Sequence, residues 1–169
     1  HEHAVSRGAK IYGEISGYGS LFSGGRNSDI EKRVEKARNT MKLCIDDSGI
    51  SPDDIDLINA NGNSDKFSDL IEAKAIKELL GGKGEEVPVH TVKSTLGESY
   101  GASGAAQTAS ALLSINNDLI PPTINCEEKD PECNLNIVKE KLEKDINTVL
   151  INSFDLSGNN SCLVIKKHE

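Results

Sequence analysis

Residues 93–106, with the sequence KSTLGESYGASGAA, combine a lysine, glycine-containing turns and a run of small side chains. A lysine among such residues is typical of the edge of an active site, where a positioned acid or base is expected beside it. Here that place is taken by Glu98, and no histidine is near it in the sequence. The segment is therefore either a catalytic loop or what remains of one.

Two other polar, glycine-containing segments share a position type with this one. NANGNSD (59–65) follows one short apolar run, and NSFDLSGNN (152–160) follows the end of another. All three segments come at the C-terminal ends of predicted strands, where the loops of open α/β sheets collect ligand-binding groups. The three loops predict a shared site, although their composition also suits ordinary turns.

Two further glycine-rich segments resemble phosphate-binding loops only superficially. GYGSLFSGG (17–25) lacks the G-x-G-x-x-G spacing, so we expect a mobile loop. GGKGEE (81–86) follows a predicted helix instead of a strand, which excludes a P-loop. Neither segment indicates a cofactor.

The elements that position these loops follow from the apolar pattern. Strands are expected at 10–19, 55–60, 87–92, 147–153 and 161–167, with helices near 29–48, 66–80 and 101–116. Residues 123–145 are polar and irregular, with a short helix around 137–143. The alternation predicts an α/β fold with one mixed five-stranded sheet covered by helices. Small residues throughout 101–116 predict that this helix is the most buried.

Bulk properties narrow the function classes. The 169 residues suffice for one domain with its own core, and the net charge of −8 argues against nucleic acid. No apolar run is long enough to span a membrane, and the polar start is no signal peptide. Because the chain lacks an initiating Met, we interpret it as a piece of a longer protein.

The cysteines indicate neither a metal site nor a redox pair. Cys126 and Cys133 are separated by six residues, and the other two cysteines are scattered. This spacing suits no zinc site, so we expect reduced cysteines, no metal and a cytoplasmic location.

Taken together, several motifs make the sequence similar to one family. They are EHAVSRGAKIYGEISGYG, GISPDDIDLINANG, VKSTLGESYGASGAA, IPPTIN, DPECNLN and NSFDLSGNNSCLVIKK, spread over nearly the whole chain. The chain resembles the C-terminal half of an elongating β-ketoacyl-acyl carrier protein synthase of type II fatty-acid and polyketide pathways. The resemblance implies that residues 1–169 form the C-terminal half of a thiolase fold.

The resemblance also identifies the catalytic positions and shows them altered. The family's cysteine nucleophile lies in the N-terminal half, and its two active-site histidines fall at Asn61 and Glu98. The family lysine is retained as Lys93, and its usual carboxylate partner is Gln107. In the family, the imidazoles donate hydrogen bonds to the malonyl thioester, and losing one such donor costs roughly 10²–10³ in rate. Asn61 can still donate, whereas ionised Glu98 cannot and is expected to pair with Lys93.

The C-terminal loop is altered as well. The usual Phe-Gly-Phe-Gly-Gly is replaced by FDLSG at 154–158, which places Phe154 and Leu156 in the expected substrate channel.

Two hypotheses follow from the resemblance, beside a plain structural fragment. The first is a non-condensing subunit like a polyketide chain-length factor, and the second is an active enzyme in which other groups replace the histidines. Either implies no cofactor and association with an N-terminal ketosynthase half. Further partners are an active ketosynthase in a heterodimer, or a second copy in a homodimer, together with acyl carrier protein.

Overall fold

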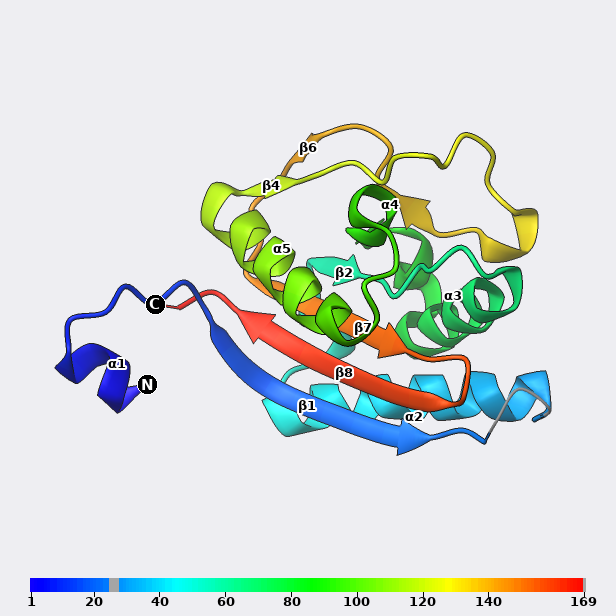
Figure 1. Ribbon diagram of the computed structural model, residues 1–169, viewed down its shortest axis with the longest axis horizontal. Coiled ribbons are helices and arrows are strands. Elements are labelled where there is room, and N and C mark those ends of the chain that lie inside the picture. The colour runs from blue at the N-terminus through cyan, green and yellow to red at the C-terminus, as the bar shows by residue number, and fades with distance from the viewer. Residues whose placement is uncertain (25–27, 169) are drawn as a thin grey trace.

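Figure 1 shows a computed structural model of the chain, in which residues 1–24 and 28–168 are described. Its main sheet has six strands in the order β1-β8-β7-β2-β3-β5. The strands are β1 (Glu14–Phe22), β2 (Leu57–Asn59), β3 (Pro88–His90), β5 (Asn136–Ile137), β7 (Thr148–Phe154) and β8 (Asn159–Lys166). The strands from β7 to β5 are parallel to one another, and β8 is antiparallel to both of its neighbours.

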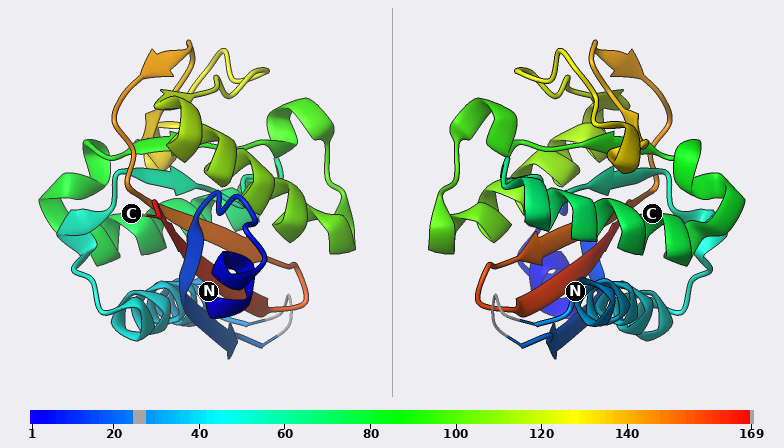
Figure 2. Two further views of the ribbon diagram at one scale, coloured as in Figure 1. Left: turned by 90° about the vertical axis from the view of Figure 1, so that its left-hand side faces the viewer. Right: turned by 90° about the vertical axis from the view of Figure 1, so that its right-hand side faces the viewer.

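The helices divide between the two faces of this sheet. α2 (Ile30–Ser48) and α3 (Lys66–Leu80) share one apolar cluster with side chains such as Ile58 and Leu150. α5 (Ser103–Asn117) shares a second cluster with Leu57, Val149 and Ile151, which alternate with the first set along the strands. Figure 2 shows α2 and α5 on opposite sides of the sheet.

Short elements complete the chain. These are α1 (Glu2–Ser6), α4 (Lys93–Leu96), the 3-10 helices Pro52–Asp54, Gly81–Glu85, Tyr100–Ala102 and Pro131–Cys133, and a two-stranded sheet of β4 (Leu119–Ile120) and β6 (Leu142–Glu143). Within the described residues, no helix is both long and apolar enough to cross a membrane.

The five predicted strands lie in one mixed sheet, as expected, but the sheet has one strand more. The prediction of a helix around 137–143 was wrong, because Asn136 and Ile137 pair with β3 as β5, and Leu142 lies in β6. The prediction of a loop at 17–25 was also wrong for residues 17–22, which belong to β1. Residue 25 lies outside the described part of the chain. Strand β1 continues along β8, and Gly17 and Gly19 let it approach α2 so closely that a Cβ would meet helix carbonyl oxygens.

The burial of α5 differs from the prediction too. It buries five residues, compared with seven in α2 and six in α3. Ala105, Ala109 and Leu113 are exposed at intervals of four and form an apolar stripe, with Leu113 64% exposed. On the same side of the sheet, β1 exposes Tyr18 and Phe22, since its alternate residues face α2. The small side chains predicted close packing around α5, but the described residues pack against one side of the helix only.

Candidate functional site

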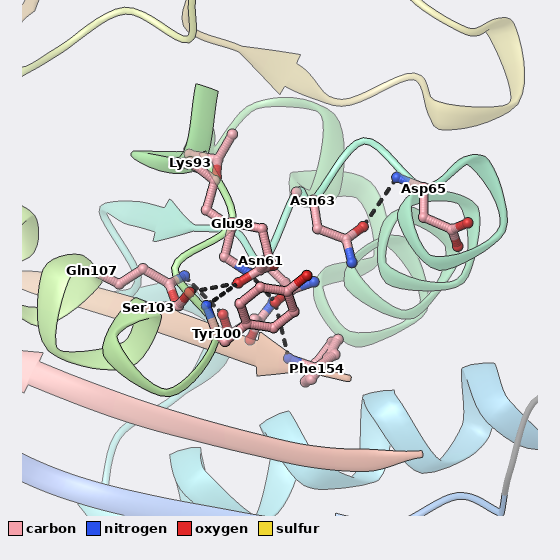
Figure 3. A network of polar contacts seen from close by, with 12 residues as sticks. Asn61, Asn63, Asp65, Lys93, Glu98, Tyr100, Ser103, Gln107 and Phe154 are labelled. Atoms are coloured by element: carbon pink, nitrogen blue, oxygen red, sulfur yellow. Dashed lines mark hydrogen bonds and ion pairs between the residues drawn. The ribbon is translucent and has the colours of Figure 1, made fainter. Parts of the chain in front are cut away.

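The site is built where three parallel strands end. Asn61 follows β2, Lys93 begins α4 just after β3, and Phe154 is the last residue of β7. Because β7, β2 and β3 are neighbours and run in the same direction, these ends meet at one edge of the sheet. Figure 3 shows the side chains converging there, with Glu98 brought in by the loop that follows α4.

Lys93 is the centre of the polar network. Its Nζ donates to Asn61 Oδ1 at 2.7 Å and to Glu98 Oε2 at 2.9 Å. The lysine side chain is only 5% exposed and that of Glu98 is 32% exposed. The predicted convergence of Asn61, Lys93 and Glu98, and the ion pair between the last two, are confirmed.

The Glu98 carboxylate has no oxygen left without a donor. Oε2 takes the lysine, while Oε1 accepts from Ser103 Oγ at 2.6 Å and from the Tyr100 backbone N–H at 3.0 Å. Burial raises the pKa of Glu98, but the hydrogen bonds from Ser103 and Lys93 outweigh it and the pKa is lowered. Glu98 is therefore ionised at neutral pH and acts only as an acceptor.

Two donors fix the orientation of the Asn61 amide. Its Oδ1 accepts from Lys93 Nζ and also from the Phe154 backbone N–H at 3.1 Å. The oxygen thus faces the lysine, and Nδ2 remains as a hydrogen-bond donor with no partner among the described residues. Asn61 is 1% exposed, yet it lines the cavity described below.

Gln107 does not join this network. Its Nε2 donates to the backbone oxygens of Asn59 at 3.3 Å, Ala60 at 3.1 Å and Asn152 at 2.8 Å. The residue is fully buried, and its Oε1 has no partner among the described residues. Gln107 therefore holds β2 and β7 to α5, and Glu98 is the carboxylate in direct contact with Lys93, while the charge of Glu72 also acts on the lysine.

Sequence reasoning missed Glu72, a buried carboxylate behind the site. It accepts from the N–H groups of Asn61 at 2.8 Å and Gly62 at 3.0 Å, and from Asn152 Nδ2 at 2.9 Å. Burial raises the pKa of Glu72. The signal in the sequence is the position of Glu72. It lies next to Ile71 among the apolar residues of α3, whereas a glutamate is ordinarily exposed to solvent.

The turn between β7 and β8 is tightly ordered around Asp155. Its Oδ1 accepts from the N–H groups of Gly158 at 2.7 Å and Asn159 at 2.9 Å and from Ser157 Oγ at 2.9 Å. Gly158 has φ +105°, and a Cβ there would collide with the Gly24 carbonyl group. The loop is therefore held by its own carboxylate.

These groups line an open cavity of about 820 Å³, called the site cavity below. Asn61, Lys93 and Glu98 line it, as do Phe154 and Leu156 from the expected substrate channel. Within the described part of the chain, His, Cys, Asp and Glu side chains nowhere form a group of three or more that could hold a metal ion.

Comparison with known proteins identifies the family. Residues 12–127 match the family described as "Beta-ketoacyl synthase, C-terminal domain". The chain belongs to the β-ketoacyl synthase family. Among curated relatives, the 3-oxoacyl-[acyl-carrier-protein] synthases 2 of Coxiella burnetii and Staphylococcus aureus are each 38% identical, over 98% and 99% of this chain. The chain covers only 40% and 41% of their lengths.

Solved structures agree with this assignment. The ishigamide ketosynthase/chain length factor superposes with a TM-score of 0.88 at 33% identity, over 99% of this chain and 41% of that one. A type II polyketide ketosynthase bound to a hexaketide, in complex with its acyl-carrier protein, gives 0.93 at 30% identity, over 100% and 42%. The fold is thus that of the C-terminal half of a ketosynthase, as expected from the sequence.

Proposed function

We propose that this β-ketoacyl synthase domain belongs to a non-condensing subunit of fatty-acid or polyketide synthesis, of the chain-length-factor type. The observation that carries the proposal is the closed ion pair between Lys93 and Glu98. Glu98 occupies one of the family's histidine positions, and both of its oxygens are already engaged by donors. The domain is taken as residues 1–169, with Asn61, Lys93 and Glu98 as altered catalytic positions.

The chemistry explains why this arrangement opposes condensation. Decarboxylation of a malonyl thioester places negative charge on the thioester oxygen, and preorganised donors stabilise that charge. An ionised carboxylate at position 98 supplies no donor, and its charge repels the enolate. Lys93 is neutralised by Glu98, whose Oε2 lies 2.9 Å from its ammonium group.

The partners follow from the open face and from the relatives. The apolar stripe of α5, together with Tyr18 and Phe22 of β1, is the surface on which the N-terminal ketosynthase half would pack. One structural neighbour pairs a ketosynthase with a chain length factor, and another is bound to its acyl-carrier protein. We expect the protein containing this chain to pair with an active ketosynthase and to contact acyl carrier protein.

An active β-ketoacyl-acyl carrier protein synthase is the second candidate, and one observation favours it. Asn61 Nδ2 is a donor fixed beside the site cavity without a partner among the described residues. In an active enzyme, this amide would take over one histidine's role during decarboxylative condensation of malonyl-acyl carrier protein with an acyl thioester. One donor in place of two predicts a slow enzyme.

The test measures malonyl-acyl carrier protein decarboxylation by the full protein that contains this chain, alone and with an active ketosynthase. We expect no activity alone. In a protein whose N-terminal half carries the nucleophile, Asn61→His with Glu98→His should produce condensing activity, whereas the conservative pair Asn61→Gln with Glu98→Gln should not. Condensation by the unmodified protein alone, at ordinary enzyme rates, would refute the non-condensing role and credit Asn61 as a working donor.

A further inference from the structure

A second cavity, of about 760 Å³, lies between α3 and the segment that follows α5; we call it the α3 cavity. It is lined by Asp69, Glu72 and Ala73 of α3, by Val89 and His90 of β3, and by parts of the segment 123–137. Among the described residues, only Lys93 lines both this cavity and the site cavity. The α3 cavity is therefore distinct from the site cavity and adjoins it at Lys93.

Two polar atoms of its lining are buried without a partner among the described residues. His90 is 2% exposed, and its Nδ1 makes no hydrogen bond, while its Nε2 lies 3.4 Å from Ser110 Oγ. Burial lowers the pKa of His90 to about 4, so the ring is neutral and Nδ1 accepts when Nε2 carries the proton. Asp69 Oδ1 is likewise buried and unpaired. Two buried acceptors without hydrogen bonds lower the stability of the fold, and a ligand with hydrogen-bond donors would satisfy both.

The charge of the lining selects among such ligands. Five carboxylates and three lysines line the cavity. The carboxylates belong to Asp69, Glu72, Glu127, Glu128 and Asp130. Two of the lysines are engaged elsewhere, since Lys93 contacts Asn61 and Glu98, and Lys129 Nζ donates to the Leu135 carbonyl oxygen at 3.2 Å. Glu127 and Glu128 are exposed and Glu72 already accepts three hydrogen bonds, so Asp69 is the carboxylate with a buried oxygen that lacks a partner among the described residues. The excess of negative charge favours a cation over an anion.

Part of the remaining lining is apolar, beside polar residues such as Thr91 and Thr123. Val89, Leu135 and Ile137 line the same cavity, next to Ala60 and Ala73. A hydrated metal ion would leave these apolar side chains in contact with water. A short hydrocarbon chain would cover them, which is favourable by roughly 25 cal/mol per Å² of apolar surface buried.

We propose that the α3 cavity binds a primary ammonium group carried on a short apolar chain. The ammonium donates to Asp69 Oδ1 and His90 Nδ1, and the chain packs on Val89, Leu135 and Ile137. This site uses none of the groups that decide condensation except the shared wall at Lys93, and it stands whether or not the proposed function holds.

The experiment titrates n-pentylammonium into the full protein that contains this chain, followed by methyl NMR. Saturable shifts at the Ile137 and Val89 methyl groups are expected at millimolar concentration, and n-pentanol and pentanoate should bind at least about tenfold more weakly. Asp69→Asn should weaken pentylammonium binding by about tenfold or more, because a hydrogen bond to a charged acceptor is lost. Asp53→Asn makes the same change at the surface, where Asp53 pairs with Lys83, and should have no effect.

A readout on the unmodified protein keeps the proposal testable if the Asp69→Asn variant does not fold. Bound pentylammonium should shift the titration midpoint of the Asp69 carboxyl carbon to lower pH and give NOEs from its chain to Ile137. Absence of saturable binding, equal binding of pentanol or pentanoate, or a folded Asp69→Asn protein with unchanged affinity would each overturn the proposal.

Discussion

Lys93 and Glu98 form an ion pair of 2.9 Å across one turn of chain, and the lysine, 5% exposed, is much the more buried partner. Removing either partner should therefore have a different effect on stability, because a solvated glutamate tolerates the loss of its partner and a buried ammonium group does not.

Glu98→Ala should destabilise the protein by about 1–3 kcal/mol, since Lys93 keeps only Asn61 as an acceptor and the N–H of Tyr100 loses its own. Urea unfolding measures the difference. Asp46→Ala is the matched control, because it removes the carboxylate of an exposed pair with Lys42 and should cost less than about 1 kcal/mol. Equal effects of the two substitutions would mean that Lys93 does not depend on Glu98.

Gln107→Glu should also destabilise the protein, although it would place a carboxylate where the resemblance to the family predicts one. The new oxygen would face the carbonyl oxygens of Asn59, Ala60 and Asn152 in a fully buried place, at a cost of about 3 kcal/mol or more. Burial would raise the folded-state pKa of this glutamate, so the loss should be small at low pH and grow as pH rises through that pKa. Gln107→Met loses the same hydrogen bonds without a charge and should show no such pH dependence.

Stability between pH 4 and 6 should reflect two opposing groups. Burial, helped by Glu72, raises the pKa of Asp69 from 3.8 to about 6, so the folded state holds a proton that the unfolded state has lost, and stability falls as pH rises. Burial lowers the pKa of His90 from 6.5 to about 4, so the unfolded state binds the extra proton and stability rises with pH. Asp69→Asn should therefore steepen the rise of unfolding free energy with pH, and His90→Phe should reverse it. Parallel curves for wild type and both variants would contradict these shifts.

Gly158→Ala should destabilise the β7–β8 turn by at least about 1–2 kcal/mol. A Cβ at φ +105° is strained, and this one would collide with the Gly24 carbonyl group. Gly82→Ala meets nothing within 4 Å and has no positive φ, so it should be close to neutral. Thermal unfolding of the two variants compares them directly, and a neutral Gly158→Ala would show that the turn can move away from Gly24.

The isolated 169-residue chain should self-associate at high concentration, because α5 and β1 leave apolar side chains uncovered on one side of the sheet. Sedimentation velocity over a range of concentrations tests this. Leu113→Glu with Phe22→Lys should reduce the association, and Leu43→Lys, which changes an exposed leucine of α2 on the other side of the sheet, should not. A monomer at every concentration would show that this surface needs no cover.

The sequence predicted the parts of this molecule that depend on local pattern. The α2 stripe, the buried run before Asn61 and the lysine after β3 were all placed correctly, because periodicity and strand-end position follow from neighbouring residues. β5 could not be predicted, since Asn136 and Ile137 become a strand only by pairing with β3. Glu72 was missed because its donors, the N–H groups of Asn61 and Gly62 and the amide of Asn152, are brought to it by the fold. The site residues themselves came from resemblance and not from pattern.

Asn61 accepts from both Lys93 Nζ and the backbone N–H of Phe154, and a histidine at position 61 could not replace both of these hydrogen bonds. A neutral imidazole has a single acceptor nitrogen, so Asn61→His alone would leave one of the two donors without an acceptor. The remaining Glu98 would also favour the protonated imidazolium, which has no acceptor nitrogen at all. Glu98→His alone would remove the carboxylate that contacts Lys93 directly. Asn61, Lys93 and Glu98 therefore act as one unit, in which neither Asn61 nor Glu98 can be exchanged for histidine without leaving a donor or a charge without its partner.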